Sequence, residues 1–169
     1  GSGKTRVLTY KISYLINKKI VKPENILAMT FTNKAAGEMK SRVESLLNDS
    51  QLSIFIGTFH SICARFLRDQ IHHIGFSSQF NIYDTKDQQD LMKTLLSDRG
   101  LFRDYSSPKK VLGKISFFKN RLIFPNEARE HVKTQKENKI IDIYEAYQHA
   151  LKDNDALDFD DLIILPLII

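Results

Sequence analysis

The sequence predicts an α/β protein with a parallel sheet, into which an all-helical segment is inserted. Two observations lead to this fold class. Short apolar runs alternate with helical patterns over residues 1–83, an order typical of a parallel sheet joined by right-handed crossovers. Helical patterns alone follow over residues 84–153, and we expect residues 154–169 to return to the first part.

The length and composition indicate a folded globular protein. A chain of 169 residues is long enough for one ordinary domain, or for one domain interrupted by a small insertion. Its 42% hydrophobic and 27% charged residues exclude a disordered or fibrous chain.

The cysteine content and the opening residues predict a cytoplasmic protein. Cys63 is the single cysteine, so no internal disulfide can form, and the chain opens without the basic and apolar leader of secreted proteins. The most apolar stretch ends the chain at residues 162–169, and it is far shorter than the roughly 20 residues that a helix needs to span a bilayer. We expect this stretch to form a buried helix, and we expect no membrane partner.

The positive charge is concentrated in one part of the chain. The formal net charge of +5 favours a polyanionic partner, although a modest surplus is also common on solvated surfaces. Residues 103–139 contain ten Lys and Arg against four Asp and Glu, whereas the rest of the chain contains 15 against 16. The whole excess therefore lies in the predicted helical segment.

Residues 1–83 predict strands that alternate with helices. Apolar spacing predicts a helix of about four turns after residue 5, which ends before Pro23. The apolar run 26–31 predicts a strand buried on both faces, followed by a helix that Thr32 or Asn33 caps. Residues 53–57 predict a second buried strand, and the helix after it ends at Gly75.

The following segment predicts helices only. One helix carries apolar residues between Leu91 and Leu96, a second begins at Ser107-Pro108, and a third covers about residues 135–152. Proline at the first helical position after a serine cap is typical of a helix start. Asp158 resembles the cap of a last helix, with Asp161 in its first turn.

The opening residues match the second half of a phosphate-binding loop, whose full pattern is G-x-x-x-x-G-K-[ST]. The matching residues are Gly1-Ser2-Gly3-Lys4-Thr5. In such a loop backbone N–H groups wrap the phosphates, the lysine reaches the β and γ phosphates, and the hydroxyl holds Mg²⁺. A Gly-Lys-Thr triplet also arises by chance, but the helix predicted after it supplies the N-terminal dipole that an anion needs. Nucleotide binding is therefore the favoured interpretation.

Polar and aromatic side chains follow both predicted strands, at the carboxyl ends where parallel sheets bind ligands. Hydroxyl, amide and imidazole groups suit phosphates, and an aromatic ring offers a face on which a base can stack. The residues concerned are Phe31, Thr32, Asn33, Thr58, Phe59 and His60. The structural alternative is that Thr32 or Asn33 only caps a helix, Phe31 lies in the core, and His60 is a capping or core histidine.

A cluster of three carboxylates follows near the end of the chain, in Leu157-Asp158-Phe159-Asp160-Asp161-Leu162. Such a cluster could hold a divalent metal or serve general acid chemistry. Acidic residues around a helix start are more commonly caps, with the phenylalanine packed inward. We favour the structural role and leave open a contact with DNA or with another domain.

Together these segments resemble the UvrD/Rep/PcrA family of superfamily one DNA helicases. The resemblance runs along the whole chain and rests on four motifs in the family's order and spacing. They are residues 1–9, residues 29–36 with Glu38-Met39, residues 58–61 and residues 157–163.

The resemblance implies a RecA-like motor domain in which residues 1–83 form the first part and residues 154–169 the return. Residues 84–153 would be an inserted helical subdomain that meets the duplex ahead of the motor. The family hydrolyses ATP with Mg²⁺ and moves 3′ to 5′ along single-stranded DNA to unwind the duplex at a junction, in repair or replication restart. We expect the same cofactors and DNA partners here, whereas the sequence points to no particular protein partner.

The resemblance also implies a role for each site residue. Lys4 and Thr5 would be the catalytic groups, with the Thr5 hydroxyl as a Mg²⁺ ligand. The nucleotide would contact Gly1, Ser2, Gly3, Lys4, Thr5 and Arg6. The single-strand track would be lined by Phe31, Thr32, Asn33, Thr58, Phe59 and His60.

Several departures from the family pattern qualify these expectations. Gly37 stands at a helix position where the family commonly has arginine. The first half of the phosphate loop, the acidic metal-binding segment and the arginines of a second motor domain are not in this sequence, so we expect an incomplete sheet and no ATP hydrolysis by these residues alone. Two other functions stay open: the motor of a helicase–nuclease complex, and a nucleic-acid-binding module without turnover.

Overall fold

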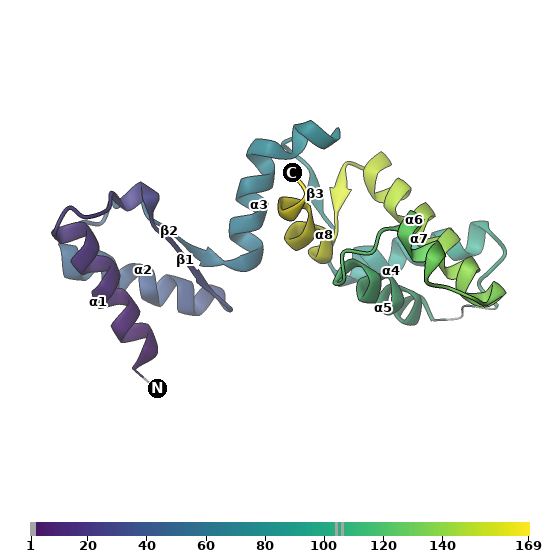
Figure 1. Cartoon of the computed structure of the whole chain (residues 1–169), viewed down its shortest axis with the longest axis horizontal. Helices are drawn as coiled ribbons and strands as arrows, with labels where there is room; N and C mark the ends of the chain where they lie inside the picture. Colours follow the sequence, from purple (N-terminus) through teal and green to yellow (C-terminus); the bar gives the residue numbers. More distant parts are fainter. Residues whose placement is uncertain (1–2, 104, 106) are drawn as a thin grey trace. The chain divides into compact units, whose positions relative to one another are not determined.

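A computed structural model describes residues 3–103, 105 and 107–169 of the chain. It is a mixed α/β structure with short parallel strands and many helices, as the sequence predicts (Figure 1). The chain divides into two compact units, Gly1–Arg65 and Phe66–Ile169, which we describe separately. Helix α3 (Phe59–Gln70) contains the boundary between them.

The first unit contains a two-stranded parallel sheet. Strands β1 (Leu27–Thr30) and β2 (Phe55–Thr58) pair in the register Leu27↔Phe55 to Thr30↔Thr58. The crossover between them is helix α2 (Asn33–Leu47), and helix α1 (Lys4–Asn17) and the short 3₁₀ helix η1 (Pro23–Asn25) precede the sheet. The predicted order of strands and helices is therefore confirmed, with boundaries shifted by one or two residues.

Both helices of this unit pack on one face of the sheet. Its core contains Ile12 of α1, Ala28 of β1, Met39 and Val43 of α2, and Ile54. On the other face of β1, Leu27 is 52% and Met29 is 37% exposed. The expectation that β1 is buried on both faces is therefore wrong for the described residues, because α1 and α2 cover the same face.

The second unit consists mainly of helices. After the end of α3 come the 3₁₀ helix η2 (Ile71–Ile74), α4 (Thr85–Asp98) and α5 (Pro108–Lys119), then α6 (Pro125–Glu130) and α7 (Gln135–Asp153). Helix α8 (Phe159–Ile164) and the 3₁₀ helix η3 (Leu165–Leu167) end the chain. Helix α6 is the one α-helix among these that the apolar spacing does not predict.

A two-residue parallel ladder joins the two ends of this helical region. Strand β3 (Asn81–Ile82) precedes α4, and strand β4 (Ala156–Leu157) follows α7. Asn81 pairs with Ala156 and Ile82 with Leu157. The chain therefore enters and leaves the helices at neighbouring points.

The core of the second unit lies between α4, α5 and α7. Its fully buried side chains include Met92 and Leu96 of α4, Ile115 of α5, and Tyr144 and Tyr147 of α7. Leu162, Ile164 and Leu165 are also buried. The expectation of one buried helix over residues 162–169 is right only in part, because α8 ends at Ile164 and residues 167–169 are exposed. No helix among the described residues is both long and apolar enough to cross a membrane.

Candidate nucleotide and nucleic-acid sites

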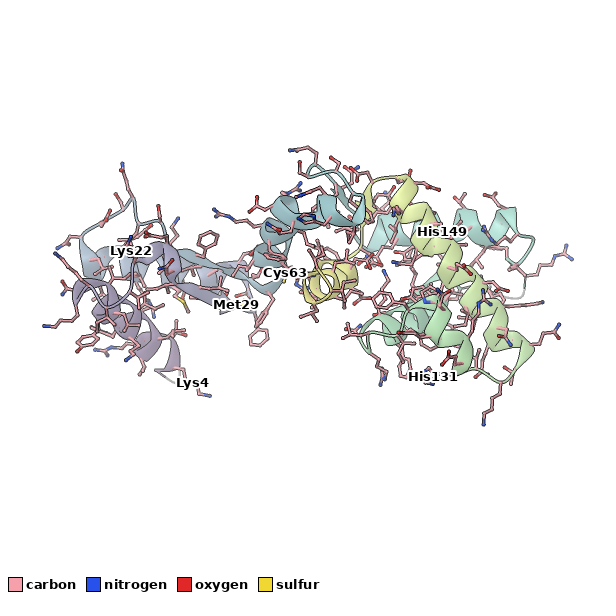
Figure 2. All side chains as sticks on the ribbon, turned by 45° about the horizontal axis from the view of Figure 1, so that its top comes forward. Lys4, Lys22, Met29, Cys63, His131 and His149 are labelled. Carbon is pink, nitrogen blue, oxygen red and sulfur yellow. The ribbon has the colours of Figure 1, made fainter. Side chains whose placement is uncertain are left out.

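The start of α1 presents the side chains predicted to bind nucleotide. Gly3 precedes the helix with φ of +67°, in the left-handed region that favours glycine, and the N–H of Val7 donates to its carbonyl at 3.0 Å. Lys4, Thr5 and Arg6 are exposed in the first turn, where Lys4 extends away from the ribbon (Figure 2). Gly1 and Ser2, which belong to the same predicted site, lie outside the described residues.

The electrostatics of this helix start suit an anion. The first N–H groups of a helix have no acceptor within it, and the helix dipole is positive at this end. The first turn of α1 contains no acidic residue. A lysine and a hydroxyl beside such free donors fit the phosphates and the Mg²⁺ of a nucleotide.

Arg6 also lines a hollow between α1 and α2. Its guanidinium lies 5.7 Å from the centre of the Tyr10 ring, and both side chains border a hollow of about 520 Å³ together with Arg42 of α2. Arg6 thus belongs both to the first turn of α1 and to the lining of this hollow.

The two strand-end segments lie next to each other. Thr30 and Thr58 are Cα partners in the sheet register, so residues 31–33 and 59–60 leave adjacent strands at the same edge. Phe31 is 91% exposed and Phe59 is 42% exposed. Their ring centres are 5.6 Å apart, with an angle of 41° between the planes. The alternative that Phe31 lies in the core is therefore wrong, and two rings are available to a ligand.

The hydroxyl groups of this edge cap the helices that begin there. Thr32 is the N-cap of α2, where its Oγ1 accepts from the N–H of Ala35 at 3.1 Å. Thr58 Oγ1 accepts from the N–H of Ser61 at 3.2 Å, and Ser61 Oγ donates to the Thr58 carbonyl at 2.9 Å. Asn33 and His60 are exposed in the first turns of the same helices. Thr32, rather than Asn33, is thus the cap, and the caps fix the rings at the edge.

Gly57 is necessary for the close approach of β2 to α3. A Cβ at this position would lie 2.6 Å from Ser61 Oγ and 3.3 Å from the Ile62 side chain. Since Ser61 Oγ also donates to the Thr58 carbonyl, a side chain at residue 57 would press on the turn that holds Phe59.

The acidic segment near the end of the chain has a different environment. Asp158 and Asp161 are buried and form the capping box of α8, in which Asp158 Oδ1 accepts from the N–H of Asp161 at 2.9 Å. The fully buried Lys119 Nζ lies 2.7 Å from Asp158 Oδ2 and 2.8 Å from Asp161 Oδ1. Tyr147 donates its hydroxyl to Asp158 at 3.1 Å. These four side chains, which we call the Lys119 network, join α5, α7 and α8.

The pKa values in the Lys119 network follow from one ammonium shared by two carboxylates. Burial raises the pKa of Asp158, but attraction and hydrogen bonding from Lys119 outweigh it, so the pKa of Asp158 is lowered. Burial raises the pKa of Asp161 to about 6, because Lys119 cannot neutralise both groups. Burial also lowers the pKa of Lys119, but Asp161 and Asp158 overcome this and raise it, so the lysine stays charged.

The structural role favoured for this segment agrees with the geometry of Asp158 and Asp161, which cap α8. The expectation that Phe159 is packed inward is wrong, because this side chain is 42% exposed. Asp160 differs from its neighbours, because it is partly exposed and accepts from the Asn120 side chain at 3.1 Å. Lys119 is the residue that the sequence reasoning missed. Its spacing could have indicated that it is buried, since Val111, Ile115 and Lys119 recur every four residues on the buried face of α5.

Among the described residues, no three His, Cys, Asp or Glu side chains are grouped so that they could hold a metal ion.

Comparison with known proteins shows the family to which this chain belongs. The family model for the UvrD/REP helicase N-terminal domain matches residues 1–169. The ATP-dependent DNA helicase PcrA of Bacillus subtilis is 49% identical over 164 residues, which are 97% of this chain and 22% of that protein. PcrA proteins of Staphylococcus epidermidis and Staphylococcus aureus are 44% identical over the same shares of both chains. This chain thus spans about a fifth of the length of these relatives, and it belongs to the family of UvrD/REP helicase N-terminal domains.

Proposed function

We propose that this chain belongs to an ATP-dependent DNA helicase that moves 3′ to 5′ along single-stranded DNA and unwinds duplex in repair or replication restart. The observation that carries the proposal is the edge of the β1–β2 sheet, where the exposed rings of Phe31 and Phe59 lie 5.6 Å apart. The start of α1 adds a phosphate site to the same unit. The relatives named as ATP-dependent DNA helicases support the reaction and the substrate.

The proposed domain layout follows the same resemblance. Residues 1–83 and 154–169 would belong to a RecA-like motor domain, and residues 84–153 would be the inserted helical subdomain. The ladder between β3 and β4 supports this layout, because it brings residues 81–82 beside 156–157. An insertion between neighbouring points disturbs the surrounding fold least.

In the proposed nucleotide site, each residue at the start of α1 has one role. Gly1, Ser2 and Gly3 would bring backbone N–H groups to the phosphates, Lys4 would neutralise the β and γ phosphates, and Thr5 would offer its hydroxyl to Mg²⁺. Arg6 would contact the nucleotide from the next turn. ATP would supply the free energy of phosphoryl transfer that drives movement.

In the proposed single-strand track, the aromatic pair and the capping hydroxyls have separate roles. A base would stack on Phe31 or Phe59, and such stacking does not depend on base identity. Thr32, Asn33, Thr58 and His60 would contact the backbone phosphates from the first turns of α2 and α3. Contacts of this kind suit a motor that must move along any sequence.

The nucleotide site can be tested in the full-length polypeptide that contains this chain. We expect ATP hydrolysis that single-stranded DNA stimulates, and we expect Lys4→Ala to abolish it while DNA binding persists. Lys18→Ala at the other end of α1 is the matched control, because it removes an exposed ammonium without touching the helix start. Full hydrolysis by the Lys4→Ala protein would overturn the proposed role of this loop.

Simple observations distinguish two other functions from the proposed helicase. A helicase–nuclease motor would cleave DNA as well as unwind it. A nucleic-acid-binding module would bind single-stranded DNA without ATP turnover, which is the behaviour we expect of these 169 residues alone. Turnover by the isolated chain that Lys4→Ala abolishes would contradict that expectation.

A further inference from the structure

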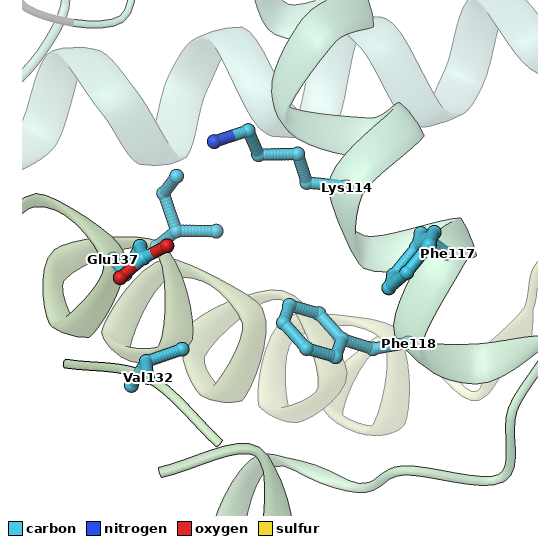
Figure 3. A pocket seen from close by; sticks show the side chains of 6 residues that line it. Lys114, Phe117, Phe118, Val132 and Glu137 are labelled. Carbon is cyan, nitrogen blue, oxygen red and sulfur yellow. The ribbon is translucent and has the colours of Figure 1, made fainter. Parts of the chain in front are cut away.

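The boundary between α5 and α7 carries a series of connected hollows in the basic segment. The first, of about 180 Å³, is lined mainly by apolar side chains (Figure 3). The second, of about 270 Å³, shares Lys114 and Ile140 with the first. The third, of about 290 Å³, shares Tyr105 and Lys136 with the second. Neighbouring hollows share lining residues, and together they follow the boundary of α5 and α7, which we call the α5–α7 groove.

Positive charge dominates the lining of the α5–α7 groove. Four ammonium groups line its length, from Lys110, Lys114, Lys136 and Lys139. Glu137 is the one acidic side chain among the lining residues that the structure describes. Its carboxylate accepts from the Thr134 hydroxyl at 2.8 Å and from the Thr134 N–H at 3.1 Å, so it serves the capping box of α7. The four lysines therefore attract anionic groups, such as the phosphates of a nucleic-acid strand.

The first hollow is aromatic and of limited size. Phe117 and Phe118 are in edge contact at 5.8 Å between ring centres, and Phe118 stacks on the buried Tyr144 at 6.3 Å. Val132 and Ile140 complete the apolar lining. An apolar cavity of about 150 Å³ is large enough for benzene, so this hollow suits one small planar ring.

Phe117, which lines the first hollow, carries a planar cation on its ring. Phe117 is 52% exposed, and the Arg121 guanidinium lies 3.5 Å from its ring centre. Guanidinium planes and aromatic rings both stack on nucleobases. A base that entered the hollow would meet the rings of Phe117 and Phe118, with Lys114 on the same wall (Figure 3).

From this juxtaposition we propose that the α5–α7 groove is a second nucleic-acid site, which binds a single strand with one unstacked base held between Phe117, Phe118 and Val132. The lysines contact the phosphates of the same strand. A paired base in a duplex offers no free face to the hollow, so the groove prefers a single strand to a duplex. The proposal rests on the proposed DNA-binding function, but it does not depend on the strand-end site at Phe31 and Phe59.

The test uses the full-length polypeptide that contains this chain, without ATP, and a short oligothymidylate that carries one 2-aminopurine. The reference protein is Phe31→Ala/Phe59→Ala, which removes the proposed strand-end rings and leaves the groove. We expect this protein to retain binding of the oligothymidylate. When Phe117→Ala is added to it, we expect the remaining affinity to fall at least about fivefold. Val132→Phe, which fills the hollow instead of emptying it, should weaken binding by a similar factor and reduce the fluorescence change of 2-aminopurine.

Charge and duplex controls complete the experiment. Lys114→Gln should lower the slope of log affinity against log salt by about 0.7, whereas Lys93→Gln on α4, outside the groove, should leave it unchanged. Binding of a blunt duplex should not respond to Phe117→Ala or Val132→Phe. Unfolding by urea shows whether each variant keeps its fold.

The outcomes separate this proposal from the proposed function. Complete loss of binding in Phe31→Ala/Phe59→Ala would overturn the groove and leave the strand-end site intact. Unchanged single-strand binding in folded Phe117→Ala and Val132→Phe, as expected if the hollow instead accepts a protein side chain, would also overturn it. An equal loss of duplex binding would contradict the single-strand preference. If only the groove variants weaken binding, the strand-end site is wrong and the groove stands.

Discussion

Three places in this chain repeat one local design, and they differ in what surrounds it. Each is a strand followed by a polar helix cap and a phenylalanine: β1 with Phe31 and Thr32, β2 with Thr58 and Phe59, and β4 with Asp158 and Phe159. In the first unit the edge is exposed, and Phe31 is 91% accessible. In the second unit the caps are buried and bound to Lys119. Phe159 is 42% exposed, as Phe59 is, so the turns differ in their caps: accessible hydroxyls in one unit, and carboxylates in a buried ion network in the other.

The difference is one of electrostatic context. A neutral hydroxyl can cap a helix at the surface and keep part of its hydrogen-bonding capacity for a ligand. A buried carboxylate must be paired, or its desolvation destabilises the fold. Changes in the Lys119 network should therefore act on stability, and changes at the strand-end rings should act on binding.

The largest effect is expected from Lys119→Met, which keeps the volume of the side chain but removes its charge. Asp158 and Asp161 would remain buried without a cation, at a cost of about 3 to 5 kcal/mol in the free energy of unfolding. Urea unfolding followed by circular dichroism measures this value. Lys93→Met on the exposed face of α4 is the matched control and should change stability little. Equal stability of the Lys119→Met and Lys93→Met proteins would show that the network does not hold the fold.

The next effect is a dependence of stability on pH that arises from Asp161. Its pKa is about 6 in the folded chain, above that of an ordinary aspartate, so the folded state binds the proton more tightly. This contribution to stability is complete below about pH 4 and is lost as the pH rises through about 6, at about 1 kcal/mol per pH unit. Asp161→Asn should remove this slope from the urea unfolding curves. An unchanged slope in that variant would assign the proton to another group.

Phe31→Ala is expected to show the opposite behaviour to a change in the Lys119 network. It should weaken single-strand binding by roughly 1 to 3 kcal/mol if the ring stacks a base. The free energy of unfolding should change by less than about 0.5 kcal/mol, since the ring is almost fully exposed. Anisotropy of a labelled oligothymidylate measures the first value. Phe66→Ala, which removes a 43% exposed ring further along α3, is the control. Loss of stability without loss of binding would show that Phe31 supports the fold and does not bind the single strand.

The smallest effect is expected from Thr32→Ala. The variant loses the hydrogen bond from the Ala35 N–H, which costs about 1 kcal/mol for a helix cap. Thr32→Ser keeps this bond and should retain nearly all of the stability. If both variants unfold at the same urea concentration, the cap does not stabilise α2.

The sequence predicted much of this fold because its signals are local. Apolar spacing, Pro108 after Ser107 and the acids at 158 and 161 each act within one turn of a helix. The ladder between β3 and β4 escaped prediction, because two-residue strands that are 75 positions apart leave no periodic pattern. The exposed face of β1 escaped for a related reason, since a short apolar run does not tell which faces will be covered.

The candidate sites also differ in whether their residues are contiguous in sequence or are brought together only by the fold. The proposed sites at Lys4, Thr5 and the strand ends could be predicted because the residues of each motif are contiguous in sequence. Lys119 is separated from Asp158 by 39 positions. In the sequence its one signal is that it follows Val111 and Ile115 at the spacing of the buried face of α5. The α5–α7 groove joins residues from two helices and the segment before α7, so only the packed structure brings them together.

The most direct test of the account is unwinding by the full-length polypeptide with ATP and Mg²⁺, on duplexes that carry a single-stranded tail at either end. We predict unwinding of a 3′-tailed DNA duplex and none of a 5′-tailed one, with loss of unwinding in the Phe31→Ala/Phe59→Ala protein. Unwinding that prefers the 5′ tail would contradict the proposed polarity. Unwinding of tailed RNA but not of tailed DNA would contradict the proposed substrate.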